Sequence, residues 1–167
     1  VLVVGNGWRP VDLPAGVRAM HLPENVGIPE GRNIGAREAR GEFIFFFDDD
    51  AVLPTPDVVE RLAGTLVQDR TLAVVQPRGA DPDGRGTARR WVPRLRATNG
   101  SGGDVAVFWE GVCCIRRSAF DEVGGWPGHF FYGHEGIDLA YRLIDAGWTL
   151  RYRPDVVVHH HAVAAAV

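Results

Sequence analysis

Hydrophobic residues along this chain form short runs, and segments with helical spacing separate them. The runs with the length and composition of β-strands are Val1–Val4, Arg18–Leu22, Phe43–Phe47, Leu72–Gln76, the segment GVCCI and the late segment TLRYRP. Helical spacing covers Pro29–Arg40, a segment that follows Thr55, a short segment from Ser118, and Glu135–Ala146. This alternation predicts an α/β fold with a mostly parallel central sheet flanked by helices.

The run Phe43–Phe47 has no polar alternation, which is typical of a central strand covered on both faces. Thr55 is the expected N-cap of the helix that follows, because Pro56 then occupies the first helical position. That helix is expected to bury four apolar side chains, those of Val58, Val59, Leu62 and Leu66.

The length of 167 residues suits one domain, so we expect residues 1–167 to form a single folded unit. Residues 78–103 are rich in Gly, Pro and Arg without a sustained period, which predicts a long loop. The chain begins with Val1, directly in an apolar run, and we therefore expect its first strand to be missing.

The net charge of -3, with acidic and basic residues scattered, offers no broad positive field for nucleic acid or anionic lipid. No apolar run approaches the roughly 20 residues of a membrane span. The two cysteines, Cys113 and Cys114, are adjacent and would point to opposite faces of a strand, so neither a disulfide nor a metal site is expected from them. These features predict a cytoplasmic protein; a peripheral position at the membrane stays open.

Three carboxylates, Asp48, Asp49 and Asp50, directly follow the phenylalanine-rich run. In extended geometry Asp48 and Asp50 project to the same side, where a hard divalent cation would relieve their repulsion. The alternative is helix capping or a solvated acidic turn. The position after a buried strand favours the metal site, since ligands in open α/β sheets gather beyond the carboxyl ends of strands.

Two further groups of residues are candidates for chemistry. Glu135 and Asp138 lie three residues apart in a predicted first helical turn, where either is a candidate general base. Asp138 also stands four residues before Arg142, so an internal ion pair is the alternative. The triplet HHH that begins at His159 continues a strand, and a neutral imidazole would complete a cation site begun by carboxylates.

In order and spacing, three segments of the chain resemble family 2 of the nucleotide-sugar glycosyltransferases, which have the GT-A fold. These segments are ENVGIPEGRNIGAREARGEFIFFFDDD, GVCCIRRSAFDEVGGW and HEGIDLAYRLIDAGWTLRYRPDVVVHH. The first corresponds to the family's run into its Asp-x-Asp motif, the second to the segment before its acceptor site, and the third to its acidic catalytic helix and last strand. The resemblance covers nearly the whole chain.

The resemblance implies a site made of distant residues. Asp48, Asp50 and His160 would hold a divalent metal, Mn²⁺ or Mg²⁺. Nucleotide contacts would come from the five positions Asn25, Arg32, Asn33, Asp48 and Asp49, although loop hydrogen bonds and a helix-face ion pair are alternatives for the first three.

This chain departs from the family's Glu-Asp catalytic turn, because Gly136 follows Glu135. The base would then be Glu135 or Asp138, or the acceptor hydroxyl would be activated otherwise. The segment YGHEGIDLAYR also resembles the corresponding segment of polypeptide N-acetylgalactosaminyltransferases, which retain anomeric configuration. Inversion is the expected outcome, with retention left open.

Together, these features predict a metal-dependent enzyme that moves a sugar from a nucleotide-diphosphate sugar to an acceptor hydroxyl. The acceptor class stays open among glycans, lipids and small molecules. Two alternatives remain: a sugar-phosphate nucleotidyltransferase, and a catalytically silent module that binds a nucleotide or sugar.

Overall fold

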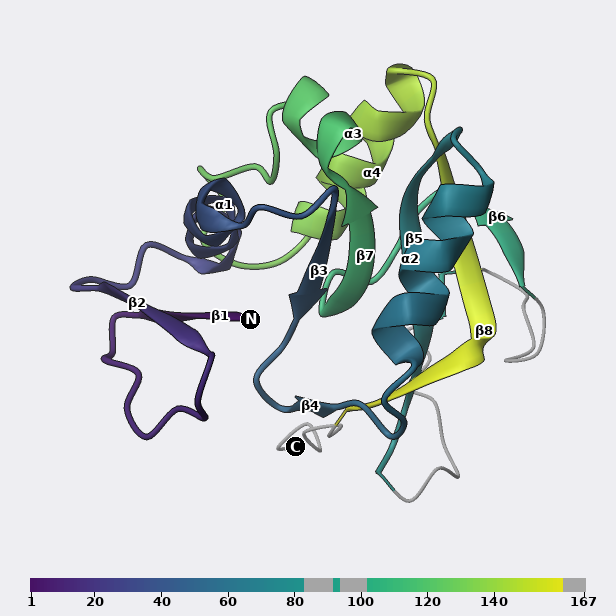
Figure 1. Ribbon diagram of the computed structural model, residues 1–167. Coiled ribbons are helices and arrows are strands. Elements are labelled where there is room, and N and C mark those ends of the chain that lie inside the picture. The colour runs from purple at the N-terminus through teal and green to yellow at the C-terminus, as the bar shows by residue number, and fades with distance from the viewer. Residues whose placement is uncertain (83–91, 94–101, 161–167) are drawn as a thin grey trace, which may run out of the picture.

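A computed structural model describes residues 1–82, 92–93 and 102–160 of the chain. Its strands are β1 Leu2–Asn6, β2 Arg18–Leu22, β3 Phe43–Phe47, β4 Ala51–Val52, β5 Leu72–Ala80, β6 Gly103–Val105, β7 Val112–Arg116 and β8 Thr149–His160. Its helices are α1 Ile28–Glu38, α2 Val58–Gln68, α3 Arg117–Glu122 and α4 Glu135–Asp145. The predicted α/β class is confirmed: a central sheet is flanked by helices (Figure 1).

The central sheet is mixed rather than mostly parallel. Its six strands follow the order β3-β7-β5-β8-β4, and β6 pairs with β8 off this path. Only β5 and β8 pair in parallel in this sheet as described, and β7 runs antiparallel to both β3 and β5. Alternating strands and helices predict parallel pairing only where a helix carries the chain back across the sheet, and no described helix lies between β5 and β7.

Strand β3 lies at the end of the strand order, not in the centre as its sequence suggested. Its apolar run nevertheless has a physical reason, since both faces of the strand are used. Ile44 and Phe46 are buried in one core cluster, whereas Phe43 and Phe45 pack partly buried against the other. The pattern of apolar side chains shows which faces of a strand are covered, but it does not show how many strands pair with it.

Two core clusters lie on opposite faces of the sheet. Helix α2 covers one face with Val58, Leu62 and Leu66, while α3 and α4 cover the other (Figure 1). Cys113 belongs to the cluster under α3 and α4, and Cys114 to the cluster under α2. Both are free thiols, as their adjacency predicted.

Several boundaries differ from those expected. Helix α2 begins at Val58 with Asp57 as its N-cap, and Val59 is 39% exposed rather than buried. Strand β5 runs on to Ala80, and most of the predicted loop 78–103 lies outside the described residues. Strands β1 and β2 form a separate parallel pair, and a further strand before them stays a prediction.

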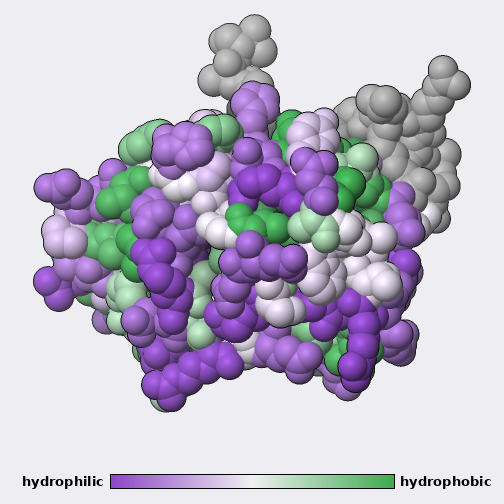
Figure 2. Space-filling model, turned by 90° about the horizontal axis from the view of Figure 1, so that it is seen from above, coloured by the Kyte–Doolittle hydropathy of each residue, from purple (hydrophilic) through white to green (hydrophobic). Residues whose placement is uncertain are grey.

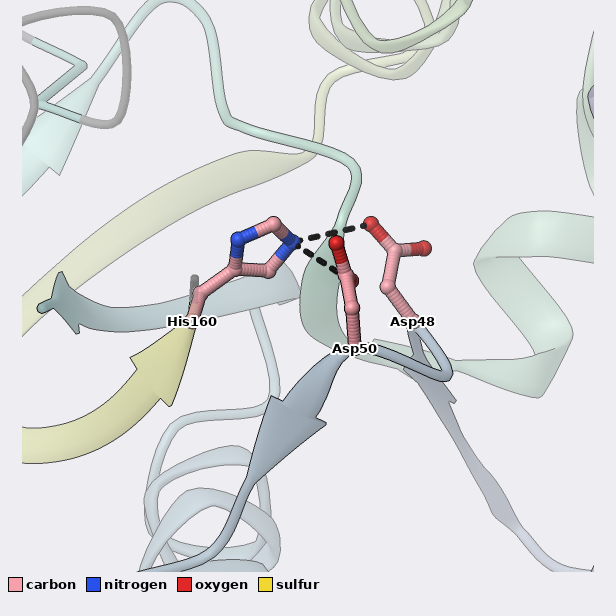
Figure 3. Close-up of side chains that lie close together, drawn as sticks. All are labelled: Asp48, Asp50 and His160. Atoms are coloured by element: carbon pink, nitrogen blue, oxygen red, sulfur yellow. Dashed lines mark ion pairs between the residues drawn. The ribbon is translucent and has the colours of Figure 1, made fainter. Parts of the chain in front are cut away.

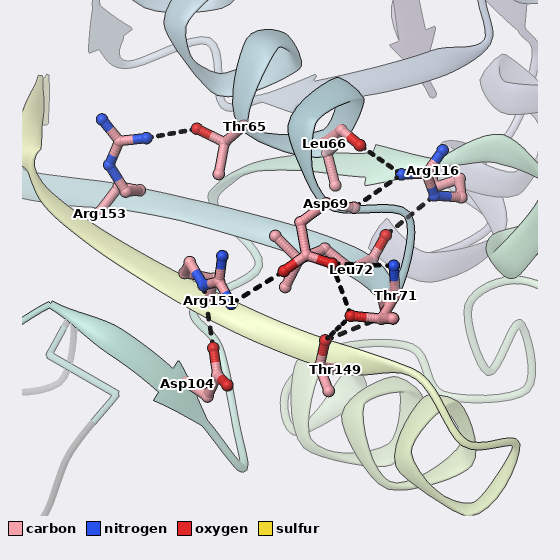
Figure 4. Close-up of polar contacts among 10 residues, drawn as sticks. All are labelled: Thr65, Leu66, Asp69, Thr71, Leu72, Asp104, Arg116, Thr149, Arg151 and Arg153. Atoms are coloured by element: carbon pink, nitrogen blue, oxygen red, sulfur yellow. Dashed lines mark hydrogen bonds and ion pairs between the residues drawn. The ribbon is translucent and has the colours of Figure 1, made fainter.

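A buried arginine of β7 joins the sheet to the end of α2 (Figure 4). Arg116, 8% exposed, donates hydrogen bonds to the backbone carbonyls of Leu66, Asp69 and Leu72 at 2.6, 3.2 and 2.9 Å. The last carbonyls of a helix have no partner within the helix, and a cation is favoured there by the helix dipole. Arg116 therefore caps α2 from the neighbouring strand and fixes that helix against the sheet.

Among the described residues, no helix is both long and apolar enough to span a bilayer. The face seen in Figure 2 is mostly hydrophilic, and its hydrophobic residues form small separate patches.

Candidate active site

Two carboxylates and one imidazole meet beyond the end of β3 (Figure 3). Nε2 of His160 lies 3.0 Å from Oδ1 of Asp50 and 3.6 Å from Oδ2 of Asp48. One ligand-type atom from each of the three residues lies within 4.8 Å of the others. The structure thus brings together the three residues predicted to hold a metal; His161 lies outside the described residues.

The register of a short strand pair sets this arrangement. Strand β4 pairs antiparallel with the end of β8, so that Ala51 lies opposite His160 and Val52 opposite His159. Asp50 directly precedes Ala51 and therefore enters the site beside His160. Because successive side chains of a strand alternate between faces, His159 belongs to the opposite face of β8 from His160.

The loop before β7 supports the cluster with residues that the sequence did not single out. The Trp109 ring meets the His160 ring edge-on, with 4.9 Å between centroids, and its backbone N–H donates to Oε1 of buried Gln76 at 2.8 Å. A Cβ built on Gly111 would stand 2.3 Å from the Trp109 ring and 2.6 Å from Oδ2 of Asp48. A side chain at position 111 would therefore displace the Trp109 ring or the Asp48 carboxylate, which explains the glycine.

Arg32 of α1 connects Asp48 with the start of α4. Its Nη2 donates to Oδ1 of Asp48 at 2.7 Å, and its Nη1 lies 3.6 Å from Oε1 of Glu135. Burial raises the pKa of Asp48, and the positive charge of Arg32 opposes that shift. Glu135 is only 2% exposed, and among the described residues its Oε2 and the Nη1 of Arg32 have no hydrogen-bond partner. Buried polar atoms are nearly always hydrogen-bonded in proteins, so these two call for an explanation, such as a catalytic role or a bound water or ion.

Asp138, the other candidate base, is engaged in the fold. Its Oδ2 accepts hydrogen bonds from Nε and Nη2 of Arg142 at 2.8 and 2.6 Å. Arg142 also donates to the carbonyls of Val123 and Gly125, at 2.6 and 2.8 Å. The pair thereby holds α4 to the turn after α3. Catalysis by Asp138 stays a prediction, and these contacts favour a structural role.

The amides of Asn25 and Asn33 are also used within the protein. Oδ1 of Asn25 accepts from Nδ2 of Asn6 at 3.0 Å and from the backbone amide two residues further on at 2.9 Å. Asn33 exchanges two hydrogen bonds with the backbone of Trp126, at 3.0 and 2.9 Å. Asp49 is exposed. Donor contacts by these residues stay predictions.

The donor set suits a divalent cation. Carboxylate oxygens are the ligands that Mg²⁺ and Mn²⁺ prefer, and an imidazole nitrogen makes Mn²⁺ well suited. Arg32 offsets part of the negative charge of Asp48, Asp50 and Glu135, and a bound cation would offset more of it. The site therefore combines three residues suited to bind a cation with the buried carboxylate of Glu135 and the guanidinium of Arg32.

Similar proteins were found by sequence and by structure. The sequence model of the family described as Glycosyl transferase family 2 matches residues 9–124. The pre-mycofactocin glycosyltransferase of Mycobacterium tuberculosis is 34% identical over 158 residues, which cover 86% of this chain and 32% of that protein. An N-acetylglucosaminyl-diphospho-decaprenol L-rhamnosyltransferase of the same organism is 37% identical over 73 residues, 42% of this chain and 24% of that protein. The chain thus spans about a third, or less, of the length of these relatives.

Solved structures share the fold at low sequence identity. GalNAc-T7, crystallised with UDP, GalNAc and Mn²⁺, superposes with a TM-score of 0.69 at 20% identity over 87% of this chain and 32% of that chain. The mannosyltransferase PcManGT of Pyrobaculum calidifontis, in complex with GDP-Man and Mn²⁺, gives a TM-score of 0.67 at 21% identity over 90% of this chain and 41% of that chain. The predicted likeness to GT-A structures is confirmed, and on the family match this chain belongs to glycosyl transferase family 2.

Proposed function

We propose that this protein is a metal-dependent glycosyltransferase that moves a sugar from a nucleotide-diphosphate sugar to an acceptor hydroxyl with inversion at the anomeric carbon. The observation that carries the proposal is the convergence of Asp48, Asp50 and His160 from separate strand ends. Arg32 and buried Glu135 adjoin this cluster. The similar structures support the donor class, since they hold UDP or GDP-Man together with Mn²⁺.

Each part of the site has a role in this reaction. Asp48, Asp50 and His160 would hold Mn²⁺ or Mg²⁺, which when bound stabilises negative charge on the departing nucleoside diphosphate. Arg32 adds a fixed positive charge at the same place, and the carboxylates of Asp48 and Glu135 hold its guanidinium on two sides. Such preorganised charge lowers the barrier because it needs no rearrangement while the bond breaks.

The decisive experiment compares two neighbouring histidines. His160→Gln removes the imidazole that faces the carboxylates, while His159→Gln changes the matched side chain on the opposite face of β8. Binding of UDP and GDP in the presence of Mn²⁺ is measured by calorimetry. Release of nucleoside diphosphate from UDP-GalNAc and GDP-mannose is then measured with and without EDTA.

We expect His160→Gln to lose metal-dependent binding and turnover, and His159→Gln to keep both within about threefold. Equal loss in the two variants, or turnover that EDTA does not reduce, would overturn the metal assignment. Binding of nucleotides without any turnover would favour the silent module. Release of pyrophosphate from a nucleoside triphosphate and a sugar phosphate would favour nucleotidyl transfer.

A further inference from the structure

A carboxylate from outside α4 occupies the space beside its first turn. A Cβ built on Gly136 would stand 2.4 Å from Oε2 of Glu110 and 2.9 Å from the carbonyl oxygen of Phe108. Real Cβ atoms do not approach that closely, so only glycine fits at position 136 while Glu110 keeps its position. Glu110 comes from the loop before β7, and no pattern in the sequence places it at α4.

Glu110 shares its surroundings with the proposed active site. Its pKa is raised by burial and by the negative charges of Glu135 and Asp48, and Arg32 opposes the shift. Unlike Glu135, which is 2% exposed, Glu110 is only partly buried and can meet an incoming molecule. In the same region, Oε2 of Glu135 and Nη1 of Arg32 are buried and make no hydrogen bond among the described residues.

The other acids nearby already have a cationic or imidazole partner. Asp138 is bound by two nitrogen atoms of Arg142. Glu135 lies against the Arg32 guanidinium, with 3.6 Å between its Oε1 and Nη1 of Arg32. Asp48 and Asp50 face the imidazole of His160. Glu110 makes no salt bridge to an arginine or histidine in the described part of the chain.

We infer that Glu110 is the general base of the reaction, and that its carboxylate takes the place of an acid on the helix at position 136. The inference rests on the proposed function. In the step, the acceptor hydroxyl oxygen forms a bond to the anomeric carbon while its proton passes to Glu110 Oε2. The bond from the anomeric carbon to the diphosphate oxygen breaks, and its electron pair leaves with the nucleoside diphosphate. The neutral acid of Glu110 then returns the proton to solvent.

The experiment removes the carboxylate and then supplies it in two other ways. Glu110→Gln keeps the shape without the basic oxygen, and Glu110→Gly opens a space. Sodium formate offers a free carboxylate to the second variant. The double variant Glu110→Gly/Gly136→Asp offers one from the helix, for which the Phe108 backbone carbonyl, 2.9 Å from the built Cβ, must also shift. The matched control is Glu60→Gln on the exposed side of α2.

The readouts are release of nucleoside diphosphate from UDP-GalNAc and GDP-mannose, and UDP–Mn²⁺ binding by calorimetry. We expect Glu110→Gln to lower turnover about 10²- to 10⁴-fold while binding stays within threefold. Formate, or the added substitution Gly136→Asp, should raise the turnover of the Glu110→Gly variant at least tenfold. A purely structural role of Glu110 would not allow this rescue. Glu60→Gln should match the parent protein.

Two outcomes would overturn the inference. One is a Glu110→Gln variant with turnover within threefold of the parent protein. The other is a Glu110→Gly variant that binds UDP and Mn²⁺ normally but is restored neither by formate nor by the second substitution. A parent protein without turnover on either donor would instead count against the proposed function itself, and the two failures are therefore distinguishable.

Discussion

Replacing Asp50 by asparagine should separate the stability of the metal-free protein from its response to Mn²⁺. At the outer distance of 4.8 Å, two carboxylate oxygens of the cluster repel by about 1 kcal/mol in water and about 3.5 kcal/mol at an effective dielectric of 20. The Asp50 side chain is 45% exposed, so the lower figure applies. The substitution also removes the 3.0 Å contact with His160. These effects oppose each other, and we expect a change within about 1 kcal/mol without metal.

With Mn²⁺ the two proteins should differ clearly. At a metal concentration of 100 times Kd, binding stabilises the parent protein by about 2.7 kcal/mol. For a domain of this size that corresponds to an increase in Tm of about 5–10 °C. If the loss of one ligand lowers the affinity for Mn²⁺ about 100-fold, the same metal concentration stabilises Asp50→Asn by only about 0.4 kcal/mol. Its Tm then rises by about 1 °C.

The assay is differential scanning fluorimetry after treatment with EDTA, with and without added Mn²⁺. Asp121→Asn, an exposed aspartate on α3, is the matched control and should keep the full increase. An increase in Asp50→Asn as large as that of the parent protein would refute the assignment of Asp50 as a ligand. A parent protein whose Tm does not respond to Mn²⁺ would refute the site as a whole.

Three further predictions concern the framework around the site. Arg116→Met leaves three backbone carbonyls without their charged donor and should lower the free energy of unfolding by about 3 kcal/mol; a urea titration showing a loss below about 1 kcal/mol would contradict the capping role. Hydrogen bonds from Arg153 lower the pKa of Asp155 to about 2, below its unfolded value of about 3.9. This carboxylate therefore stabilises the fold at neutral pH, and the stabilisation is lost as the pH falls from about 4 to 2. Asp155→Asn should therefore be less stable than the parent protein at pH 7, by a margin that shrinks at pH 3, and urea midpoints that differ equally at both pH values would contradict this. Burial raises the pKa of the Cys114 thiol to about 12 and that of the Cys113 thiol well above its usual range. A thiol reagent at pH 8 should therefore modify neither cysteine until urea unfolds the protein. Rapid labelling of the native protein would show that β7 is not covered as described.

The sequence allowed part of the site to be predicted. Asp48 and Asp50 could be predicted because these carboxylates directly follow a recognisable strand in the sequence. His160 required the resemblance to a family, since a histidine triplet does not say which ring faces which neighbour. Residue type alone also left Asn25 and Asn33 ambiguous, because an amide that closes a loop and an amide that binds a nucleotide have the same sequence signature.

Other features depend on contacts between segments far apart in the chain. Glu110 was missed because its carboxylate occupies the space that a side chain at position 136 would need. Only the packing of the loop before β7 against α4 reveals this relation. The antiparallel direction of β7 was missed for a similar reason. Hydrophobic spacing predicts where a strand lies and which faces are covered, but the route by which the chain enters the sheet determines its direction.

The two-residue pairing of β4 with the end of β8 has a consequence for how the protein acquires its site. The aspartates belong to an early segment and the imidazole to the close of the described chain, so a partly folded intermediate in which β8 has not yet docked would carry the acids alone. Tight capture of the ion would then require β4 and β8 to have paired. Uptake of Mn²⁺ during refolding would consequently report the formation of this strand pair rather than the first collapse.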